Sequence, residues 1–503
     1  MEENYNMEYS KIASKLDTKQ TTRFYWILVA IATTGGFLFG LDTANIGSAL
    51  LFIPYKLTVF ELGYLVAGAS LGAAIGALIA GPLTDRSGRK YMLIADAIIY
   101  GVGAIFSAVA INTVLLLIAR TVIGIGVGAD SAIATAYIVE MAPKDKRGKL
   151  AVMQQMMIIL GILAAFLIAV GVFAIKPVVS FEVTYGWRIL LGVAVIPAIL
   201  AAAFRTKIPE SPRWLVLHGK FEKAQKSLKM MGITVSLNEL MESGKREKIE
   251  QKKLQRKKFW TPGVKYAFIL MALWMTFQQI TGINIPLYYG PYIISKLHIF
   301  PTVVNPVTIA IYSILSTFAM AWVFIPSTYI MMEREDKTGR RKLGLIGYIG
   351  MAIGMFVTYI LLIEHADIGI LFSLGFYLIM FSIGVGGAGW LLQGEMFPTE
   401  HRGTLAAGIA AVDWIANFVI IEIFPYMLTA VKLSGSMLIF SILSVMALII
   451  FYFMLPEVKQ KSLEEINTMM DSIGRSKFSQ RMSIIRGTAE KTSEKVPEAK
   501  ESK

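Results

Sequence analysis

The 503-residue sequence contains no cysteine and only four histidines. The absence of cysteine excludes disulfides, thiol catalysis and cysteine-based metal sites. The histidines do not show the HExxH-type spacing of a zinc site, and no pairing of a nucleophile with a base is apparent. We therefore expect neither an enzyme nor a bound metal or cofactor.

Charge is also scarce. Charged residues make up 17 % of the chain, against about 25 % in soluble domains, and hydrophobic residues make up 55 %. The mean hydropathy is +0.59. These values indicate an all-α protein with many membrane-spanning helices. The net charge of +14 lies in loops and tails, so it gives no reason to expect a nucleic-acid partner.

About twelve stretches are long and apolar enough to cross a bilayer as helices. They lie near residues 24–50, 60–82, 91–110, 114–139, 150–174, 186–205, 265–295, 303–331, 343–363, 367–394, 404–430 and 434–455. The predicted organisation is a tail at 1–23, a six-helix half at 24–205, a helical linker at 206–264, a second six-helix half at 265–456 and a partly disordered tail at 457–503.

Lysine and arginine gather in alternate loops, notably at 86–90, 144–149 and 334–342. The positive-inside rule places these loops, the linker and both termini in the cytoplasm. The plasma membrane is the expected location. The basic tail beyond Met470 is predicted to be disordered or in contact with membrane lipid.

Charged motifs at the predicted cytoplasmic helix ends occur twice. The matching residues are Asp85 with Asp336, Arg89 with Arg340, Glu140 with Glu395, and Arg147 with Arg402. The aspartates are 251 positions apart (336 − 85), and the glutamates and the last arginines 255 (395 − 140 and 402 − 147). This repeat predicts two halves related by an axis along the membrane normal, with a site between them. Ion pairs among these residues are candidate latches that hold an outward-facing state, or they only determine topology.

The seventh span contains an unusually polar stretch at 277–291. Its amides and tyrosines include Gln278, Gln279, Asn284 and Tyr288, and glycines and prolines interrupt the helix. Lipid cannot hydrogen-bond such groups, so they must face protein or a water-filled cavity. Uncharged donors and acceptors beside aromatic rings suit a neutral polyhydroxylated ligand, whereas the alternative is a polar tie between helices.

Several motifs in order along the chain carry a family resemblance. They are residues 35–43 (GGFLFGLDT), 120–128 (RTVIGIGVG), 209–215 (PESPRWL), 278–279 (QQ) and 456–466 (PEVKQKSLEEI). With them, the sequence from about Gly35 to Ile466 resembles the sugar porter family of the major facilitator superfamily. The resemblance implies the two-half helical fold of that family and transport of a sugar or polyol.

Site roles follow from the same resemblance. Amides that hydrogen-bond sugar hydroxyls in similar transporters match Gln155, Gln278, Gln279 and Asn284. The aromatic residue that stacks against the sugar ring matches Trp390, and a further polar position of that cavity matches Asn417. Bidentate amides suit hydroxyl groups, and an apolar sugar face suits an aromatic ring.

Asp42 lies deep in the first span, and Arg120 on the fourth span is its candidate partner. A buried carboxyl beside a cation can exchange protons near neutral pH. The pair resembles that of proton-coupled sugar porters, whereas facilitators tend to have a neutral residue at this position. A purely structural Asp42–Arg120 pair is the alternative.

Two further acids depart from the sugar-porter pattern. Asp130 follows a stretch that resembles phosphate and organic-acid relatives, and Asp413 replaces a neutral polar residue. These acids could add proton sites, favour a cationic or amino-bearing ligand, or only pair with Arg120. Asp96, nearer the cytoplasmic edge, could be a latch partner. The sequence predicts a proton-coupled importer of a monosaccharide or polyol. The alternatives are a sugar facilitator, an organic-anion or phosphate symporter and, remotely, a sugar sensor.

Overall fold

The computed structural model describes residues 23–486 apart from 142–146, 246–258, 298, 301, 399–400, 460 and 462. The tail residues 1–22 and 487–503 and the linker residues 246–258, all covered by predictions above, lie outside this description. Within the described residues the chain is helical and contains no strand, so the predicted fold class is confirmed.

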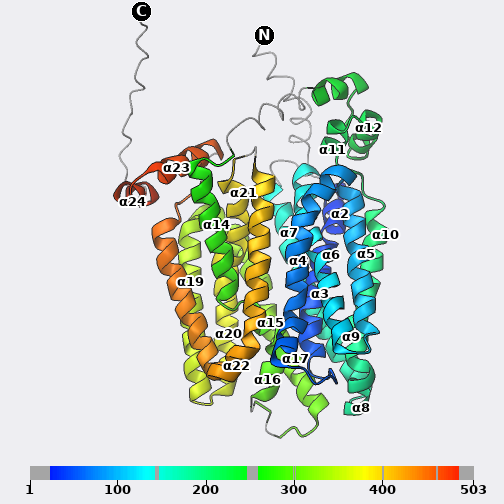
Figure 1. Cartoon of the computed structure of the whole chain (residues 1–503), viewed down its shortest axis with the longest axis vertical. Helices are drawn as coiled ribbons and strands as arrows, with labels where there is room; N and C mark the ends of the chain where they lie inside the picture. Colours follow the sequence, from blue (N-terminus) through cyan, green and yellow to red (C-terminus); the bar gives the residue numbers. More distant parts are fainter. Residues whose placement is uncertain are drawn as a thin grey trace, which may run out of the picture.

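The first half of the bundle is built from six spans (Figure 1). The first span is kinked at Thr33 and the sixth contains a π-helical turn. The elements are α2 (Arg23–Ala32), α3 (Thr34–Ala49), α4 (Val59–Ser87), α5 (Arg89–Ala108), α6 (Thr113–Met141), α7 (Arg147–Ile175), α8 (Val179–Phe181), η1 (Glu182–Gly186), α9 (Trp187–Val193) and α10 (Val195–Arg205).

The second half follows a helical linker. The described part of the linker contains α11 (Pro212–Leu217), α12 (Phe221–Met230) and a further helical stretch at 237–245. The second half consists of α14 (Pro262–Ile280), α15 (Ile285–Tyr288), α16 (Gly290–Lys296), α17 (Pro306–Trp322), α18 (Phe324–Thr338), α19 (Arg340–Ile363), α20 (Asp367–Phe381), η2 (Ser382–Gly386), α21 (Gly387–Met396) and α22 (Arg402–Met454). Two short helices, α23 (Leu463–Arg475) and α24 (Phe478–Arg486), come last.

Eleven helical stretches of the described chain are long and apolar enough to cross a membrane. The last of them, α22, contains 53 residues and is interrupted at Lys432, where φ is 59° and ψ is 179°. This break separates the two predicted spans at 404–430 and 434–455. The eleven stretches therefore contain the twelve predicted spans.

Small residues let the helices approach closely where lipid and protein are equally apolar. On α4 and α6, Gly72 lies against the carbonyl of Thr121, and Gly124 lies against the carbonyl of Ala69. Backbone contacts of this kind depend on the absence of a side chain, because in a membrane helices associate through packing rather than through water exclusion.

The linker helices and the last two helices share one end of the bundle (Figure 1). We call it the linker end, and the end that carries α8 and α16 the opposite end. The helix α23 is attached to α14 by Asp471, whose Oδ1 accepts from the backbone N–H of Gly263 at 2.9 Å. At the linker end, the first half is thus covered by the chain segment that follows the sixth span, and the second half by the segment that follows the last span.

A bulky residue at Gly124 is expected to destabilise the bundle. A Cβ atom there would overlap the backbone of Ala69, whereas a Cβ at Gly171 on α7 meets nothing within 4 Å. Gly124→Val should cost about 1–3 kcal/mol and lower the melting temperature of the detergent-solubilised protein. Gly171→Val, the matched control, should melt close to the wild type. Equal melting temperatures for the two variants would contradict this packing.

Candidate functional site

The seventh span, called helix 7 below and distinct from the element α7, is broken in the middle of the bundle. The helix α14 ends at Ile280, Gly282 takes a φ of 91°, and the chain resumes in the short helices α15 and α16. Because a positive φ cannot continue a right-handed helix, the break frees backbone groups and redirects the side chains that follow it. The polar stretch predicted at 277–291 therefore forms a turn between helices.

The amides of helix 7 form a chain of hydrogen bonds that crosses the bundle. Gln279 Nε2 donates to Asp413 Oδ1 at 2.8 Å, and Asn284 Nδ2 donates both to Gln279 Oε1 at 2.9 Å and to Asn417 Oδ1 at 2.8 Å. Asn417 Nδ2 then donates to Ser70 Oγ at 3.1 Å. Ser70 lies on α4, so this amide chain connects the second half to the first.

Asp42 and Arg120 form a buried bidentate ion pair. Their exposed fractions are 4 % and 0 %. Arg120 Nη1 binds Asp42 Oδ1, and Nη2 donates to Oδ2 at 2.9 Å. The third guanidinium nitrogen, Nε, donates to the Leu65 carbonyl at 3.0 Å. Two parallel charge-assisted bonds in a dry environment make a strong and specific contact.

The ion pair adjoins the amide chain. Thr43, the neighbour of Asp42, donates to the Tyr288 hydroxyl at 3.4 Å. The Tyr288 backbone also lies against Gly47 of α3. The predicted site residues of the first, fourth, seventh and eleventh spans thus lie together where the two halves meet.

Gln278 is buried next to α21. Its Oε1 atom is inaccessible and has no hydrogen-bond partner in the described residues. Gly389 of α21 approaches this oxygen so closely that a side chain there would overlap it. An unsatisfied buried amide oxygen is costly. The role of Gln278 as a hydrogen-bond acceptor for a ligand stays a prediction.

Trp390 and Gln155 stand apart from the amide chain. Trp390 follows Gly389 on α21 and is 39 % exposed, and its ring packs against no other aromatic ring in the described part of the chain. Gln155 on α7 is partly buried, and its amide has no partner among the described residues. Both side chains remain available to a ligand, but the structure does not join them to the other predicted site residues.

Asp130 does not pair with Arg120. Arg205, the last residue of α10, binds Oδ1 of Asp130 through Nη2 and Oδ1 of Asp96 through Nη1. Gln154 on α7 donates to the second oxygen of Asp130 at 3.2 Å. The suggestion that Asp130 pairs with Arg120 is therefore wrong. Asp96 pairs with Arg205 in this structure, and its role as a latch partner stays a prediction. Arg205 was missed, although a lone arginine closing an apolar span was a visible signal.

Charged residues at the linker end form matching contacts in the two halves. Arg89 binds Glu140 at 3.0 Å and Asp85 at 3.3 Å. Arg340 binds Glu395 at 2.9 Å. Arg402 instead donates to the Phe397 carbonyl. The side chains of Arg147 and Asp336 lie outside the description. Each of these ion pairs joins helices of one half, so none of them ties the two halves together directly.

Two glutamates missing from the sequence predictions complete this end. Glu210 accepts from the backbone N–H of Arg89 at 3.0 Å, and Glu457 accepts from that of Arg340 at 3.1 Å. Both arginines follow a glycine with positive φ, Gly88 or Gly339. Burial raises the pKa of the Glu210 carboxyl, although the backbone N–H donors act in the opposite direction. The signal was a Pro-Glu pair after the sixth and the last span.

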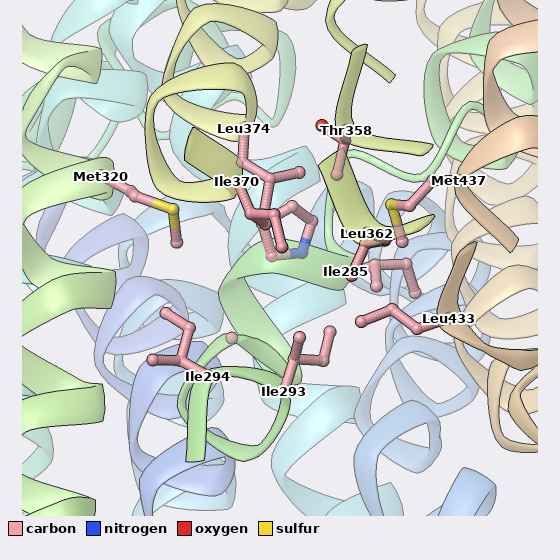
Figure 2. A pocket seen from close by; sticks show the side chains of 12 residues that line it. Ile285, Ile293, Ile294, Met320, Thr358, Leu362, Ile370, Leu374, Leu433 and Met437 are labelled. Atoms are coloured by element: carbon pink, nitrogen blue, oxygen red, sulfur yellow. The ribbon is translucent and has the colours of Figure 1, made fainter. Parts of the chain in front are cut away.

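An apolar pocket lies on another side of the broken helix (Figure 2). Ile285 and Pro286 line it together with residues of four further helices, including Met320, Leu374 and Met437. Its one polar side chain, Thr358, is bonded to the Gly354 carbonyl. This pocket offers nothing to a ligand rich in hydroxyl groups, so the polar site lies on the faces of helix 7 that carry the amides.

Removing Arg205 should destabilise the fold. In Arg205→Gln, Asp96 and Asp130 would remain buried without a cation, which costs about 3–5 kcal/mol. Thermal unfolding in detergent should show a large loss. The double variant Arg205→Gln/Asp96→Asn should recover part of that loss, because it contains one buried charge fewer. A wild-type melting temperature for Arg205→Gln would contradict the observed role of the cluster.

Comparison with known proteins agrees with this geometry. Residues 28–470 match the family described as sugar (and other) transporter. The arabinose-proton symporter of Bacillus subtilis is 33 % identical over 460 residues, which cover 90 % of this chain and 96 % of the relative. The D-xylose-proton symporter of Escherichia coli is 32 % identical over 492 residues, covering 91 % and 98 %.

Solved structures lead to the same family. The partially occluded inward-open structure of the xylose transporter XylE from Escherichia coli superposes with a TM-score of 0.75 and 29 % identity. The superposition covers 88 % of this chain and 100 % of the XylE chain. Helix count, broken helix and repeated end motifs are thus found in a chain that matches solved transporters over nearly its whole length. The protein belongs to the sugar transporter family of the major facilitator superfamily.

Proposed function

We propose that this protein is a secondary active transporter that imports a monosaccharide or polyol together with protons by alternating access. One observation carries the proposal: the buried Asp42–Arg120 pair lies beside the amide chain. Tyr288 contacts both Thr43, the neighbour of Asp42, and Ser70, the last member of the amide chain. A group that exchanges a proton therefore adjoins groups suited to hydroxyls. The similar relatives named above are proton symporters of arabinose and xylose.

A neutral ligand fits the site better than an anion. Arg120 is bound to Asp42, and Arg205 is bound to Asp96 and Asp130. The two fully buried arginines thus have no charge to spare for a phosphate or carboxylate. Amides such as Gln278, Asn284 and Asn417 supply donors and acceptors without charge, which suits sugar hydroxyls. This distribution disfavours the organic-anion and phosphate alternatives.

The ion pair supplies a rule for coupling. Deprotonated Asp42 holds Arg120 and thereby fastens α3 to α6. A proton on Asp42 weakens that contact, and because α3 meets the second half where Thr43 contacts Tyr288, the change lets the halves rock around the bound sugar. Moving one charge through 100 mV supplies about 2.3 kcal/mol, which is enough for roughly fifty-fold accumulation. The ion pairs of Arg89 and Arg340 brace each half as a rigid body during this motion.

Asp413 sets the direction of the amide chain. Because Asp413 Oδ1 accepts from Gln279 Nε2, the other end of the Gln279 amide, its oxygen, faces Asn284 and accepts from Asn284 Nδ2. The donors and acceptors that a sugar meets therefore depend on Asp413. It acts as an orienting residue of the sugar wall, whereas Asp42 is the proton-coupling residue.

The charge distribution orients the protein in the membrane. Basic residues lie at the linker end, including Arg89, Lys90, Arg340 and Arg341. By the positive-inside rule this end and both termini face the cytoplasm. The bacterial relatives support the plasma membrane as its location. The opposite end then faces outward, where sugar and protons enter.

Uptake into proteoliposomes tests the function and the coupling residue together. Wild-type protein should accumulate radiolabelled xylose, arabinose or glucose when a proton gradient is imposed. Asp42→Asn mimics the neutral carboxyl at every pH, so it should abolish accumulation while retaining sugar binding and sugar exchange. Accumulation of phosphate or a carboxylate, but of no sugar, would contradict the substrate assignment.

The other acids are the controls of that assay. Asp130→Asn and Asp413→Asn should still accumulate sugar under a proton gradient, because neither acid is the proposed coupling residue. Asp413→Asn should bind sugar more weakly, because Asp413 orients Gln279. If either of them loses accumulation while Asp42→Asn keeps it, coupling occurs elsewhere. If none of the three matters and wild-type protein only equilibrates sugar, the protein is a facilitator.

Removing a site amide should weaken sugar binding. Gln278→Ala and Asn284→Ala each leave ligand hydroxyls unpaired, which costs about 1–3 kcal/mol, or roughly fivefold to 150-fold in Kd. Gln225 in the linker bonds only the Val235 carbonyl, so Gln225→Ala is the control and should bind normally. Unchanged equilibrium binding in both site variants would exclude helix 7 as the sugar wall.

A further inference from the structure

Glu422 is a carboxyl at the contact between the two halves. It lies on α22, beyond Asp413 toward the opposite end, where α22 packs against α4. Gly63 of α4 lies against it: a Cβ on Gly63 would be 3.0 Å from both Cδ and Oε1 of Glu422. At the same interface, the rings of Tyr64 and Phe418 lie with their centroids 6.0 Å apart. The carboxyl is therefore covered by the other half of the molecule.

Both carboxyl oxygens are inaccessible, and neither has a hydrogen-bond partner in the described chain. Glu422 also forms no ion pair there. The groups that face it do not compensate a charge. From α4 it meets the backbone of Gly63, and on helix 7 the Tyr289 hydroxyl donates to the Ile421 carbonyl instead. Glu61, the acid nearest on α4, has the same sign and is bonded to Thr58.

An ionised carboxylate without water, cation or donor is strongly disfavoured in such a place. The neutral acid fits, because it removes the charge and leaves only a small polar group to bury. When α4 and α22 separate at the opposite end, the same group meets water and can ionise. The closed arrangement thus holds one proton more than the open one.

We propose that Glu422 is a second proton-binding site, which controls closure of the opposite end. This proposal rests on the proposed alternating-access function. The site at Glu422 differs from the coupling site at Asp42, because Asp42 has a cation as its partner. A proton must bind Glu422 before α4 and α22 can close over it. Acid therefore favours closure, and this preference is lost as the pH rises and the closed form gives up its proton.

The chain contains no cysteine, so two introduced cysteines can be spin-labelled without background. Ile111 and Ile368 lie at the opposite end in different halves and are exposed. The full-length Ile111→Cys/Ile368→Cys protein, reconstituted without sugar, reports closure by the distance distribution between the labels across pH. The ratio of closed to open forms should fall up to about tenfold per pH unit where Glu422 titrates.

Glu422→Gln should remain closed at high pH, because its side chain is neutral and similar in shape. The comparison is repeated in the Asp42→Asn background, where the remaining pH dependence should disappear on adding Glu422→Gln. Glu61→Gln, an exposed acid at the same end, is the control and should behave like its parent. A pH response that is absent in the parent, or that is unchanged by Glu422→Gln, would overturn the proposal.

Sugar uptake by the same variants separates the two ideas. Glu422→Gln should still couple sugar to protons, with a shifted pH dependence of its rate, whereas Asp42→Asn should not couple. If no sugar is transported but closure still depends on Glu422 and pH, the proposed function is wrong and the proposed role of Glu422 is right. If uptake is coupled to protons but closure does not depend on Glu422, the proposed role of Glu422 is wrong and the proposed function is right.

Discussion

A charged group inside the hydrocarbon of a bilayer is very costly unless a group of opposite charge compensates it. This constraint accounts for the ion pairs of the buried acids in the first half. Asp42 is matched by Arg120, and Asp96 and Asp130 share Arg205. All of these partners belong to the first half, and Asp42 also adjoins the second half, where its neighbour Thr43 contacts Tyr288. Among the described residues, in contrast, Asp413 and Glu422 on α22 and Glu182 on η1 have no cation as a partner.

Asp413 and Glu422 lie where α22 packs against helices of the first half. Near Asp413, the ring of Trp414 contacts Phe39 of α3 at 5.1 Å. Near Glu422, the chain packs on Gly63 of α4. The environment of an acid on this helix therefore depends on how the halves sit against each other. Proton binding and conformation are linked wherever burial of a titratable group differs between two states.

The break in helix 7 solves a related problem for uncharged groups. In a continuous helix, residues 278, 279, 284 and 288 would point in several directions, because each residue turns the helix by about 100°. After Gly282 the chain changes direction, so that Asn284 reaches Asn417 and Tyr288 reaches Thr43. A single interruption brings polar side chains toward helices of both halves. Meanwhile the linker end, with Glu210 and Glu457 capping equivalent helices, keeps each half rigid.

The sequence by itself determined the number of spans, the two-half repeat, the polar stretch of helix 7 and the pairing of Asp42 with Arg120. The first three features are local or periodic: a span needs only length and hydropathy, and a repeat needs only matching positions. The pairing of Asp42 with Arg120, 78 positions apart, was instead predicted from the family resemblance. Tertiary structure decided the partners of the remaining acids. Arg205 meets Asp96 and Asp130 across 109 and 75 positions, and the linker-end ion pairs stay within one half. It also decided that Glu422 lies under Gly63. Periodicity predicts the face of a helix on which a residue lies. It does not predict which distant helix covers that face, because rotation and register are set by packing of the whole bundle.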